Sequence, residues 1–161
     1  MSDPNLIAAP TAWELAVRPG FLIRRLHQIH LAMFAEECGP SGITPVQYSI
    51  LSVAAAQPGL EQTRLGYEVG VDRTTLANVV ARPEAKRLLT RVRGTTDRRL
   101  KHVTLTRTGA DLLDRIAEPA RRAHARTIEA LPEAERDVFL RALARLVDAG
   151  NAYGRAPLRL S

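Results

Sequence analysis

Lysine and arginine side chains are concentrated in one stretch of this 161-residue sequence. Residues 82–107 contain nine Lys or Arg and two acidic residues, so this stretch has a net charge of +7. Because the whole chain carries +6, the remaining residues together sum to −1. Cationic side chains gathered in this way are suited to binding phosphate groups, such as those of a nucleic acid backbone. The alternative is a solvated cationic face with no partner.

Other residue types that commonly carry chemistry are sparse. The sequence has no Gly-rich phosphate loop, no nucleophile elbow, no HExxH and no CxxC pair. His27 and His30 share a helical face and could hold a metal ion with Glu36 or Glu37 as helpers, but a clear third ligand is missing. The single cysteine, Cys38, is compatible with an oxidant sensor or, more simply, with a quiet buried thiol. We therefore expect no enzyme activity, no bound metal and no cofactor.

The composition favours a mainly helical protein with one hydrophobic core. Apolar residues make up 45% of the chain and aromatic residues only 4%, while Ala, Leu and Arg dominate. No apolar run is long enough to span a membrane, and the N-terminal residues lack the basic and apolar regions of a signal peptide. One cysteine cannot form an internal disulfide framework. These features predict a cytoplasmic protein.

Helix-capping residues and helical periodicity predict the element order α-α-α-α-β-β-α-α. Pro19, Thr44-Pro45 and Asp72 stand where helices should begin, and Gly70 can adopt the left-handed conformation that ends one. A short helical turn is predicted within residues 11–17, followed by helices over residues 19–38, 45–56, 61–69 and 72 to about 82. After the strands, a long helix is predicted from residue 106, interrupted at Pro119, and a last helix from residue 132. The predicted strands, 88–93 and 101–105, flank the sequence GTTDRR. This is a mainly α protein with a small β-hairpin, in the order of a winged helix-turn-helix.

This order and three motifs resemble the MarR family of bacterial transcription regulators. The motifs are Thr44-Pro45-x-Gln47-Tyr48, Gly70-Val71-Asp72-Arg73-Thr74-Thr75-Leu76, and Asp97-Arg98-Arg99 followed by Val103-Thr104-Leu105-Thr106-x-x-Gly109. The resemblance covers about residues 18–150 and implies an intertwined, obligate homodimer. The expected parts are an N-terminal arm and short helix (1–17), dimerisation helices (18–43 plus 106–151), a winged helix-turn-helix DNA-binding lobe (44–105) and a C-terminal tail (152–161).

The resemblance assigns a set of residues to double-stranded DNA. A dimer presents two recognition helices to successive major grooves, so a palindromic operator is expected. Residues at the start of the helix after Asp72 are expected to read base edges, and Arg98 and Arg99 to reach DNA from the hairpin. Lys101, Arg91 and Arg93 are expected to contact phosphates. Asp97 is expected to brace an arginine. The candidate DNA-binding residues are Arg73, Thr74, Thr75, Asn78, Arg82, Arg91, Arg93, Arg98, Arg99 and Lys101.

Two residues depart from the pattern of the family. Pro83 stands near a position that is usually Leu, and Arg87 near one that is usually Gly. Proline inside a helix removes a hydrogen bond and costs about 3 kcal/mol, so the recognition helix is predicted to stop or kink near Arg82. Arg87 must make the turn into the hairpin without the freedom of glycine at positive φ.

Family resemblance also implies a small-molecule effector, an aromatic acid or phenol bound between the DNA-binding lobe and the dimer interface. Arg24 and Arg25 could hold its carboxylate, or the phosphates of a CoA thioester. The candidate ligand-binding residues are Trp13, Arg24, Arg25, His27, His30, Met33, Phe34 and Tyr48. The alternative is that the apolar residues of this helix are ordinary dimer core. His102 and His124 are isolated in the sequence and are expected to be structural.

The expected function is therefore a homodimeric, ligand-responsive transcriptional repressor, released from its operator by a small aromatic acid or the CoA thioester of one. Three alternatives remain open at this point. They are a ligand-independent architectural DNA-binding protein, an oxidation-sensing regulator acting through Cys38, and a protein-interaction winged helix without DNA binding.

Overall fold

The computed structural model describes residues 12–95 and 97–154, with only the backbone given for residues 12 and 13. The elements in this part of the chain are α1 (Ala12–Ala16), α2 (Pro19–Cys38), the 3-10 turn η1 (Gly39–Ser41), α3 (Pro45–Ala56), β1 (Leu60–Glu61), α4 (Gln62–Glu68), α5 (Arg73–Ala85), β2 (Leu89–Arg93), β3 (Lys101–Leu105), α6 (Arg107–Ile128), α7 (Glu133–Gly150) and the 3-10 turn η2 (Asn151–Tyr153).

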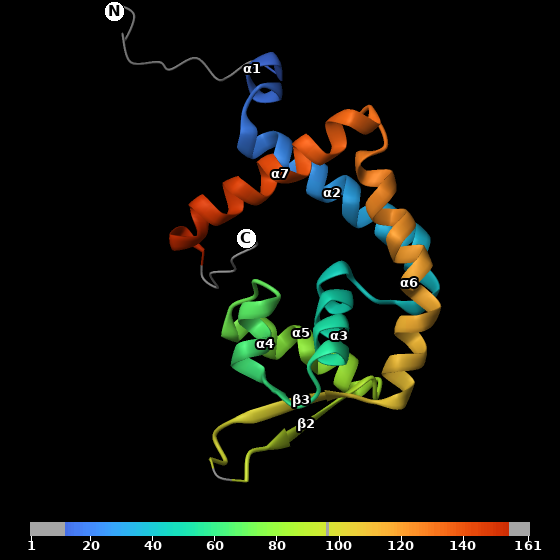
Figure 1. Cartoon of the computed structure of the whole chain (residues 1–161), viewed down its shortest axis with the longest axis vertical. Helices are drawn as coiled ribbons and strands as arrows, with labels where there is room; N and C mark the ends of the chain where they lie inside the picture. Colours follow the sequence, from blue (N-terminus) through green and yellow to red (C-terminus); the bar gives the residue numbers. More distant parts are fainter. Residues whose placement is uncertain (1–11, 96, 155–161) are drawn as a thin grey trace, which may run out of the picture.

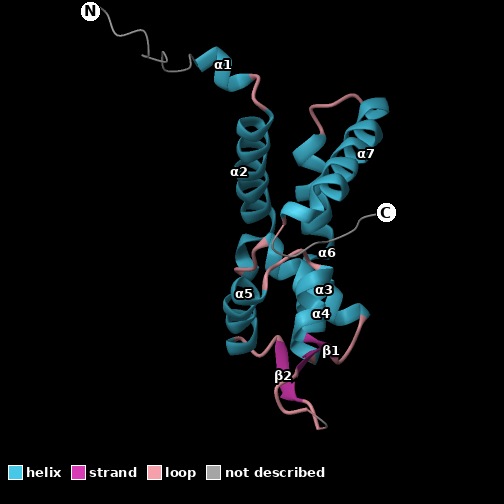
Figure 2. Cartoon of the chain, turned by 90° about the vertical axis from the view of Figure 1, so that its left-hand side faces the viewer, coloured by secondary structure: helices cyan, strands magenta, loops and turns pink. Residues whose placement is uncertain are grey.

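The elements divide between two ends of the molecule. Helices α2 and α7 and the end of α6 occupy one end, and α3, α4, α5 and the strands occupy the other (Figure 1). The β2–β3 hairpin, residues 89–105, is called the wing below, and it projects from the far end of the molecule (Figure 2). Helix α6 runs from the wing to α7, and α2 packs mainly on α6. This long helix therefore connects the two ends.

Two helices begin at the residues predicted to cap them, and another ends as predicted. In α3, the Gln47 N–H donates to Thr44 Oγ1 at 3.3 Å and the Thr44 N–H donates to Gln47 Oε1 at 3.1 Å. In α5, the Asp72 carboxylate accepts from the N–H groups of Thr74 and Thr75. After α4, Gly70 has a φ of 67°, in the left-handed region. These caps satisfy backbone groups that have no partner inside a helix, and so they fix these boundaries.

Thr106 and Gly109 join the wing to α6. Thr106 Oγ1 accepts from the Gly109 N–H at 3.0 Å and donates to the carbonyl oxygen of Arg87 at 2.6 Å. A Cβ atom at position 109 would lie 2.2 Å from the carbonyl oxygen of Leu88, so only glycine fits there. The Leu-Thr-x-x-Gly part of the wing motif therefore holds the start of α6 against the start of the wing.

The sheet has three strands, in the order β1-β3-β2, where the sequence predicts only a hairpin. Strand β1 pairs antiparallel with β3, with Leu60 opposite Val103. The sequence indicates only a turn and the start of a helix at this place. It does not indicate β1, because a strand of two residues is too short to show an alternation of apolar and polar side chains. Its pairing ties the helix-turn-helix to the base of the wing.

The prediction that the recognition helix stops or kinks near Arg82 is wrong about a stop, since α5 continues through Pro83 to Ala85. Pro83 is fully buried, so packing of its ring offsets the missing backbone donor. Arg87 does adopt the positive φ that the sequence requires of it, at 58°. The Leu88 N–H donates to the carbonyl oxygen of Pro83 at 2.9 Å, and the Arg87 N–H donates to that of Glu84 at 2.8 Å. These two bonds form a Schellman motif that ends α5.

Replacing Arg87 by glycine should therefore stabilise the protein. The left-handed conformation costs a non-glycine residue about 1–2 kcal/mol, part of which the greater freedom of glycine in the unfolded chain offsets. We expect the free energy of unfolding of Arg87→Gly to rise by about 1 kcal/mol, measured by urea denaturation at one protein concentration. Lys86→Gly is the matched control, because Lys86 has a φ of −80° and should lose stability on this change. A fall in stability for Arg87→Gly would contradict the assignment.

Apolar side chains fall into a covered group and an uncovered one. The core of the lobe is built from α3, α4, α5, α6 and the strands, and Phe34 and Cys38 pack on Ala120 and Ala123 between α2 and α6. In contrast, the described residues of α7 include none that is buried, and Leu146 is 64% exposed. Leu22 on α2 is 49% exposed. The chain by itself therefore leaves apolar side chains of α2 and α7 largely uncovered. No described helix is both long and apolar enough for a bilayer span.

Candidate nucleic-acid interface and ligand site

One face of α5 carries the polar residues that the sequence predicts for base reading. Leu76 and Val80 are buried and hold the other face of the helix on the lobe core. Thr75 also donates its hydroxyl to Asp72 Oδ2 at 2.6 Å, which leaves its methyl group and its acceptor lone pairs for a ligand. Arg73, Thr74, Thr75, Asn78 and Arg82 are all exposed. At 100° per residue, Thr74, Thr75, Asn78 and Arg82 fall within about 100° of one another around the helix, and Arg73 lies outside that sector.

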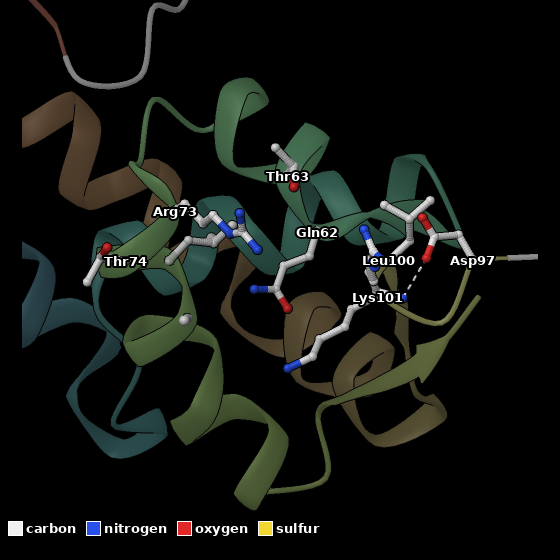
Figure 3. A pocket seen from close by; sticks show the side chains of 10 residues that line it. Gln62, Thr63, Arg73, Thr74, Asp97, Leu100 and Lys101 are labelled. Carbon is white, nitrogen blue, oxygen red and sulfur yellow. Dashed lines mark hydrogen bonds between the residues drawn. The ribbon is translucent and has the colours of Figure 1, made fainter.

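Between α5, the start of α4 and the wing lies an open pocket with a volume of about 580 Å³. Figure 3 shows the side chains around it. It is lined by Gln62, Thr63, Arg73, Thr74, Leu76, Ala77, Asp97, Arg99, Leu100 and Lys101. Gln62 is a residue that the sequence did not indicate, and its side-chain Oε1 is buried without a hydrogen-bond partner among the described residues. No sequence signal could find it, because its position beside the wing depends on the pairing of β1 with β3.

The tip of the wing presents two exposed arginines, Arg98 and Arg99. Asp97 Oδ1 accepts a hydrogen bond from the backbone N–H of Arg99 at 2.8 Å. The Leu100 N–H donates to the carbonyl oxygen of Asp97 at 3.1 Å, which closes the turn. Asp97 thus braces an arginine, as the sequence predicts, and the group that it holds is the backbone N–H of Arg99. Arg99 lines the pocket beside α5, and Arg98 lies on a separate, shallower surface with Val92 and Arg93.

Arg91 differs from the other basic residues of the wing. Its Nε donates to Glu84 Oε2 at 2.9 Å, and its Nη2 donates to the same oxygen. The side chain of Arg91 is 19% exposed and that of Glu84 33%. Hydrogen bonding to Arg91 lowers the pKa of Glu84 from its usual value, so this carboxylate is ionised. Arg93 and Lys101, by contrast, are exposed.

Three of the candidate ligand residues gather between α2, α3 and α6. The Phe34 ring lies 5.9 Å from the Tyr48 ring and 6.1 Å from the His30 ring, measured between centroids. His124 stacks on His30 at 4.9 Å, so it is part of this cluster and not isolated as the sequence suggests. His124 lies close in sequence to Ala120 and Ala123, which are on the buried side of α6. This spacing could have indicated that His124 faces α2.

The hydrogen bonds of Thr127 fix the proton position on His30. Thr127 Oγ1 donates to the carbonyl oxygen of Ala123 at 2.8 Å. It must therefore accept from His30 Nδ1, which lies 2.9 Å away. The neutral imidazole then carries its proton on Nδ1 and presents Nε2 as a hydrogen-bond acceptor. Burial first, and then the charges of His124 and His27, lower the pKa of His30 below its usual value of 6.5, which favours this neutral form.

The lowered pKa of His30 makes the stability of the fold depend on pH. In the window below about pH 6.5 the unfolded chain binds a proton at this residue that the folded chain does not. The contribution of His30 to stability is thus present above that pH and is lost as pH falls through the window to the folded pKa. We expect the midpoint of urea unfolding to fall as pH drops below about 6.5, and to fall less in His30→Gln. Equal slopes for the two proteins would contradict this.

Arg24 and Arg25, two of the other candidate ligand residues, make contacts elsewhere on α2. Arg24 lies over the Phe21 ring at 5.3 Å, and Arg25 donates to the side chain of Gln28 at 2.9 Å. Both arginines and His27 are exposed, and Met33 is half-buried. The side chain of Trp13 lies outside the described residues. The role of these five residues in ligand binding remains a prediction.

Glu36 and Glu37, suggested above as helper ligands of a metal, are paired with arginines instead. Arg126 donates to Glu36 and to Glu37, both at 2.8 Å, and Arg122 donates to Glu37 at 2.9 Å. These pairs join α2 to α6. Beside them Cys38 is buried, and burial raises the pKa of its thiol. An oxidant sensor needs an accessible thiolate, so this geometry disfavours that alternative.

Comparison with known proteins agrees with this arrangement. Residues 41–100 match the model of the MarR family. A protein described as a transcriptional regulatory protein for the hcr operon of Thauera aromatica is 34% identical over 143 residues, which cover 88% of this chain and 84% of that protein. The PcaV transcriptional regulator from Streptomyces coelicolor, solved in complex with its natural ligand, is 34% identical, with 89% of this chain and 99% of that chain covered and a TM-score of 0.77.

A second solved structure shows a relative on DNA. It is the repressor CouR bound to a 23-mer DNA duplex, 28% identical, with 86% of this chain and 99% of that chain covered and a TM-score of 0.76. The family resemblance, the winged helix-turn-helix and the expectation of a regulator rather than an enzyme are therefore confirmed. The chain belongs to the MarR family of transcriptional regulators.

Proposed function

We propose that this regulator is a repressor that binds a palindromic operator as a homodimer. The observation that carries the proposal is that the exposed side of α5 borders the open pocket of about 580 Å³ between α5 and the wing. Arg73, Arg99 and Lys101 line this pocket. Helix and wing on either side of such a concavity suit a major groove and the phosphates beside it. The complex of CouR with a DNA duplex supports this use of the fold.

The uncovered apolar stripes support the homodimer. Leu22 on α2 is 49% exposed and Leu146 on α7 is 64% exposed in the single chain. Large apolar side chains left in water favour association, and a second copy of the same chain can cover them around a two-fold axis. In this proposal residues 18–43 and 106–151 form the dimer, and 44–105 form the DNA-binding lobe.

The effector we propose is a small aromatic compound with a hydroxyl group, as a free acid or a CoA thioester. The aromatic faces of Tyr48 and His124, which lie beside the buried Phe34, suit its ring, and His30 Nε2 can accept from its hydroxyl. Relatives point to the same chemistry: BpsR of Bordetella bronchiseptica responds to 6-hydroxynicotinic acid, and CouR of Rhodococcus jostii RHA1 binds p-coumaroyl-CoA. Arg25 is about 140° from His30 around α2 at 100° per residue, so a small acid cannot contact both in one chain.

The experiment starts from a duplex that the wild-type protein selects from a random-sequence pool, called the selected duplex below. Fluorescence anisotropy on this duplex then measures release by 4-hydroxybenzoate, p-coumarate and p-coumaroyl-CoA, with CoA alone as the control. We expect one compound class to release DNA and His30→Gln to weaken that release without changing DNA affinity. If none of these compounds releases the protein from DNA, the proposed effector class is wrong. Equal binding to all sequences, with strong salt dependence, would favour the architectural alternative instead.

A further inference from the structure

The last turn of α5 lies against the wing. Pro83 is fully buried, and Glu84 directly after it is half-buried on the side where α5 contacts β2. The Schellman motif at Lys86–Leu88 leaves only these three residues between α5 and β2. Glu84 belongs to the turn that α5 gains by continuing past Pro83. A helix that stopped at Arg82 would not carry this carboxylate to the wing.

Arg91 is the residue of the wing that meets this carboxylate. It shares a strand face with Leu89 and Arg93, because side chains two residues apart on a strand point the same way. Along this face Leu89 is opposite Leu105 in the core, Arg91 is opposite the buried Val103, and Arg93 is opposite Lys101. The face therefore changes from core, through the Glu84–Arg91 ion pair, to a pair of exposed cations.

We infer that the Glu84–Arg91 ion pair is a positioning element that sets the wing at a fixed distance from α5, and that Arg91 does not contact phosphate. Two hydrogen bonds from the guanidinium to one carboxylate oxygen define a direction as well as a distance. Since the pair is half-shielded from water, it is less screened than a surface pair. The base of the wing is already held through Thr106 and Gly109, and the ion pair holds it further out.

This inference rests on the proposed DNA-binding function, since DNA is what the spacing would serve. It also corrects the charge attributed to the wing. Arg91 is neutralised inside the lobe, so the cations that remain for phosphate on this face are Arg93 and Lys101. If Arg91 contacts phosphate, removal of Glu84 should strengthen DNA binding. If the ion pair positions the wing, removal of Glu84 should weaken DNA binding, so the two roles can be told apart.

The test is a charge swap. We compare Glu84→Arg, Arg91→Glu and the double variant, which has the net charge of the wild type, with Arg93→Gln as the control on the same strand face. Affinity for the selected duplex is measured from about 50 to 200 mM salt, the range over which phosphate contacts show in the salt dependence. Without DNA, amide hydrogen exchange of the wing is followed by mass spectrometry.

For a positioning pair, each single variant should lose about tenfold or more in affinity, since a hydrogen bond to a charged group contributes that much. The double variant should recover most of the loss. Wing exchange should be faster in the single variants and return toward wild type in the double variant, with Arg93→Gln unchanged. Arg93→Gln should instead reduce the slope of log affinity against log salt by about 0.9 for each DNA phosphate that it no longer neutralises.

The inference is overturned if Arg91→Glu remains weak when combined with Glu84→Arg, or if Glu84→Arg alone binds DNA more tightly. Unchanged wing exchange in both single variants also overturns it. If the wild type selects no duplex from the pool, the proposed function fails, and hydrogen exchange alone then decides whether the ion pair positions the wing.

Discussion

Arg98→Ala is expected to weaken binding to the selected duplex by about 100-fold or more while leaving the dimer intact. Arg98 is exposed at the tip of the wing, where the backbone turn is held by the bond from the Leu100 N–H to Asp97. A charge-assisted hydrogen bond contributes about 1.5–3 kcal/mol, and a dimer loses it at two wings, which gives about 3–6 kcal/mol in total. Fluorescence anisotropy at one salt concentration measures the loss.

The control for Arg98→Ala is Arg141→Ala. Arg141 is an exposed arginine on α7, at the end of the molecule opposite the wing, and its loss changes the net charge by the same amount. It should bind the selected duplex as the wild type does. Sedimentation velocity checks that both variants keep the oligomeric state of the wild type. Wild-type affinity for Arg98→Ala would remove the wing tip from the DNA interface.

Leu146→Asp is expected to shift the protein from dimer to monomer and to abolish tight binding to the selected duplex. Leu146 is 64% exposed in the single chain, on the apolar stripe of α7. Removing a buried leucine costs about 1.5–3 kcal/mol, and the two-fold axis makes each change count twice. The dimer dissociation constant should therefore rise on the order of a thousandfold or more, with a further cost from burying the carboxylate.

Arg145→Asp is the matched control for Leu146→Asp, because it places the same side chain at the neighbouring position of α7. Arg145 is exposed and lies on the polar side of the helix by its spacing from Phe139 and Leu143. Sedimentation equilibrium should find it dimeric and Leu146→Asp monomeric. A dimer that persists in Leu146→Asp would show that another surface joins the two copies.

The sequence by itself determined the local structure and much of the candidate surface. Helix starts at Thr44 and Asp72 follow from side chains that bond to backbone groups within three residues, so no distant contact is needed to predict them. The family resemblance, which places Arg87 near a position that is usually Gly, indicated a positive φ there, and Arg87 has a φ of 58°. The polar face of α5 was predictable too, because helical spacing alone assigns Leu76 and Val80 to the core and Asn78 to the outside.

Only the tertiary structure decided which side chains meet across elements. Arg91 and Arg93 look alike in the sequence, yet one is paired with Glu84 and the other is exposed, because α5 continues past Pro83 and brings its last turn to β2. Local cost predicted that Pro83 would stop or kink the helix, and α5 continues past it because burial of its ring outweighed that cost.

The same reason governs the ligand site. His124 joins His30 because α6 packs along α2, a contact between residues far apart in the chain that no spacing rule encodes. Local hydrogen bonds and helical periodicity act within a few residues and can be read from the sequence. Partners across the core depend on packing, and packing is decided by the whole fold.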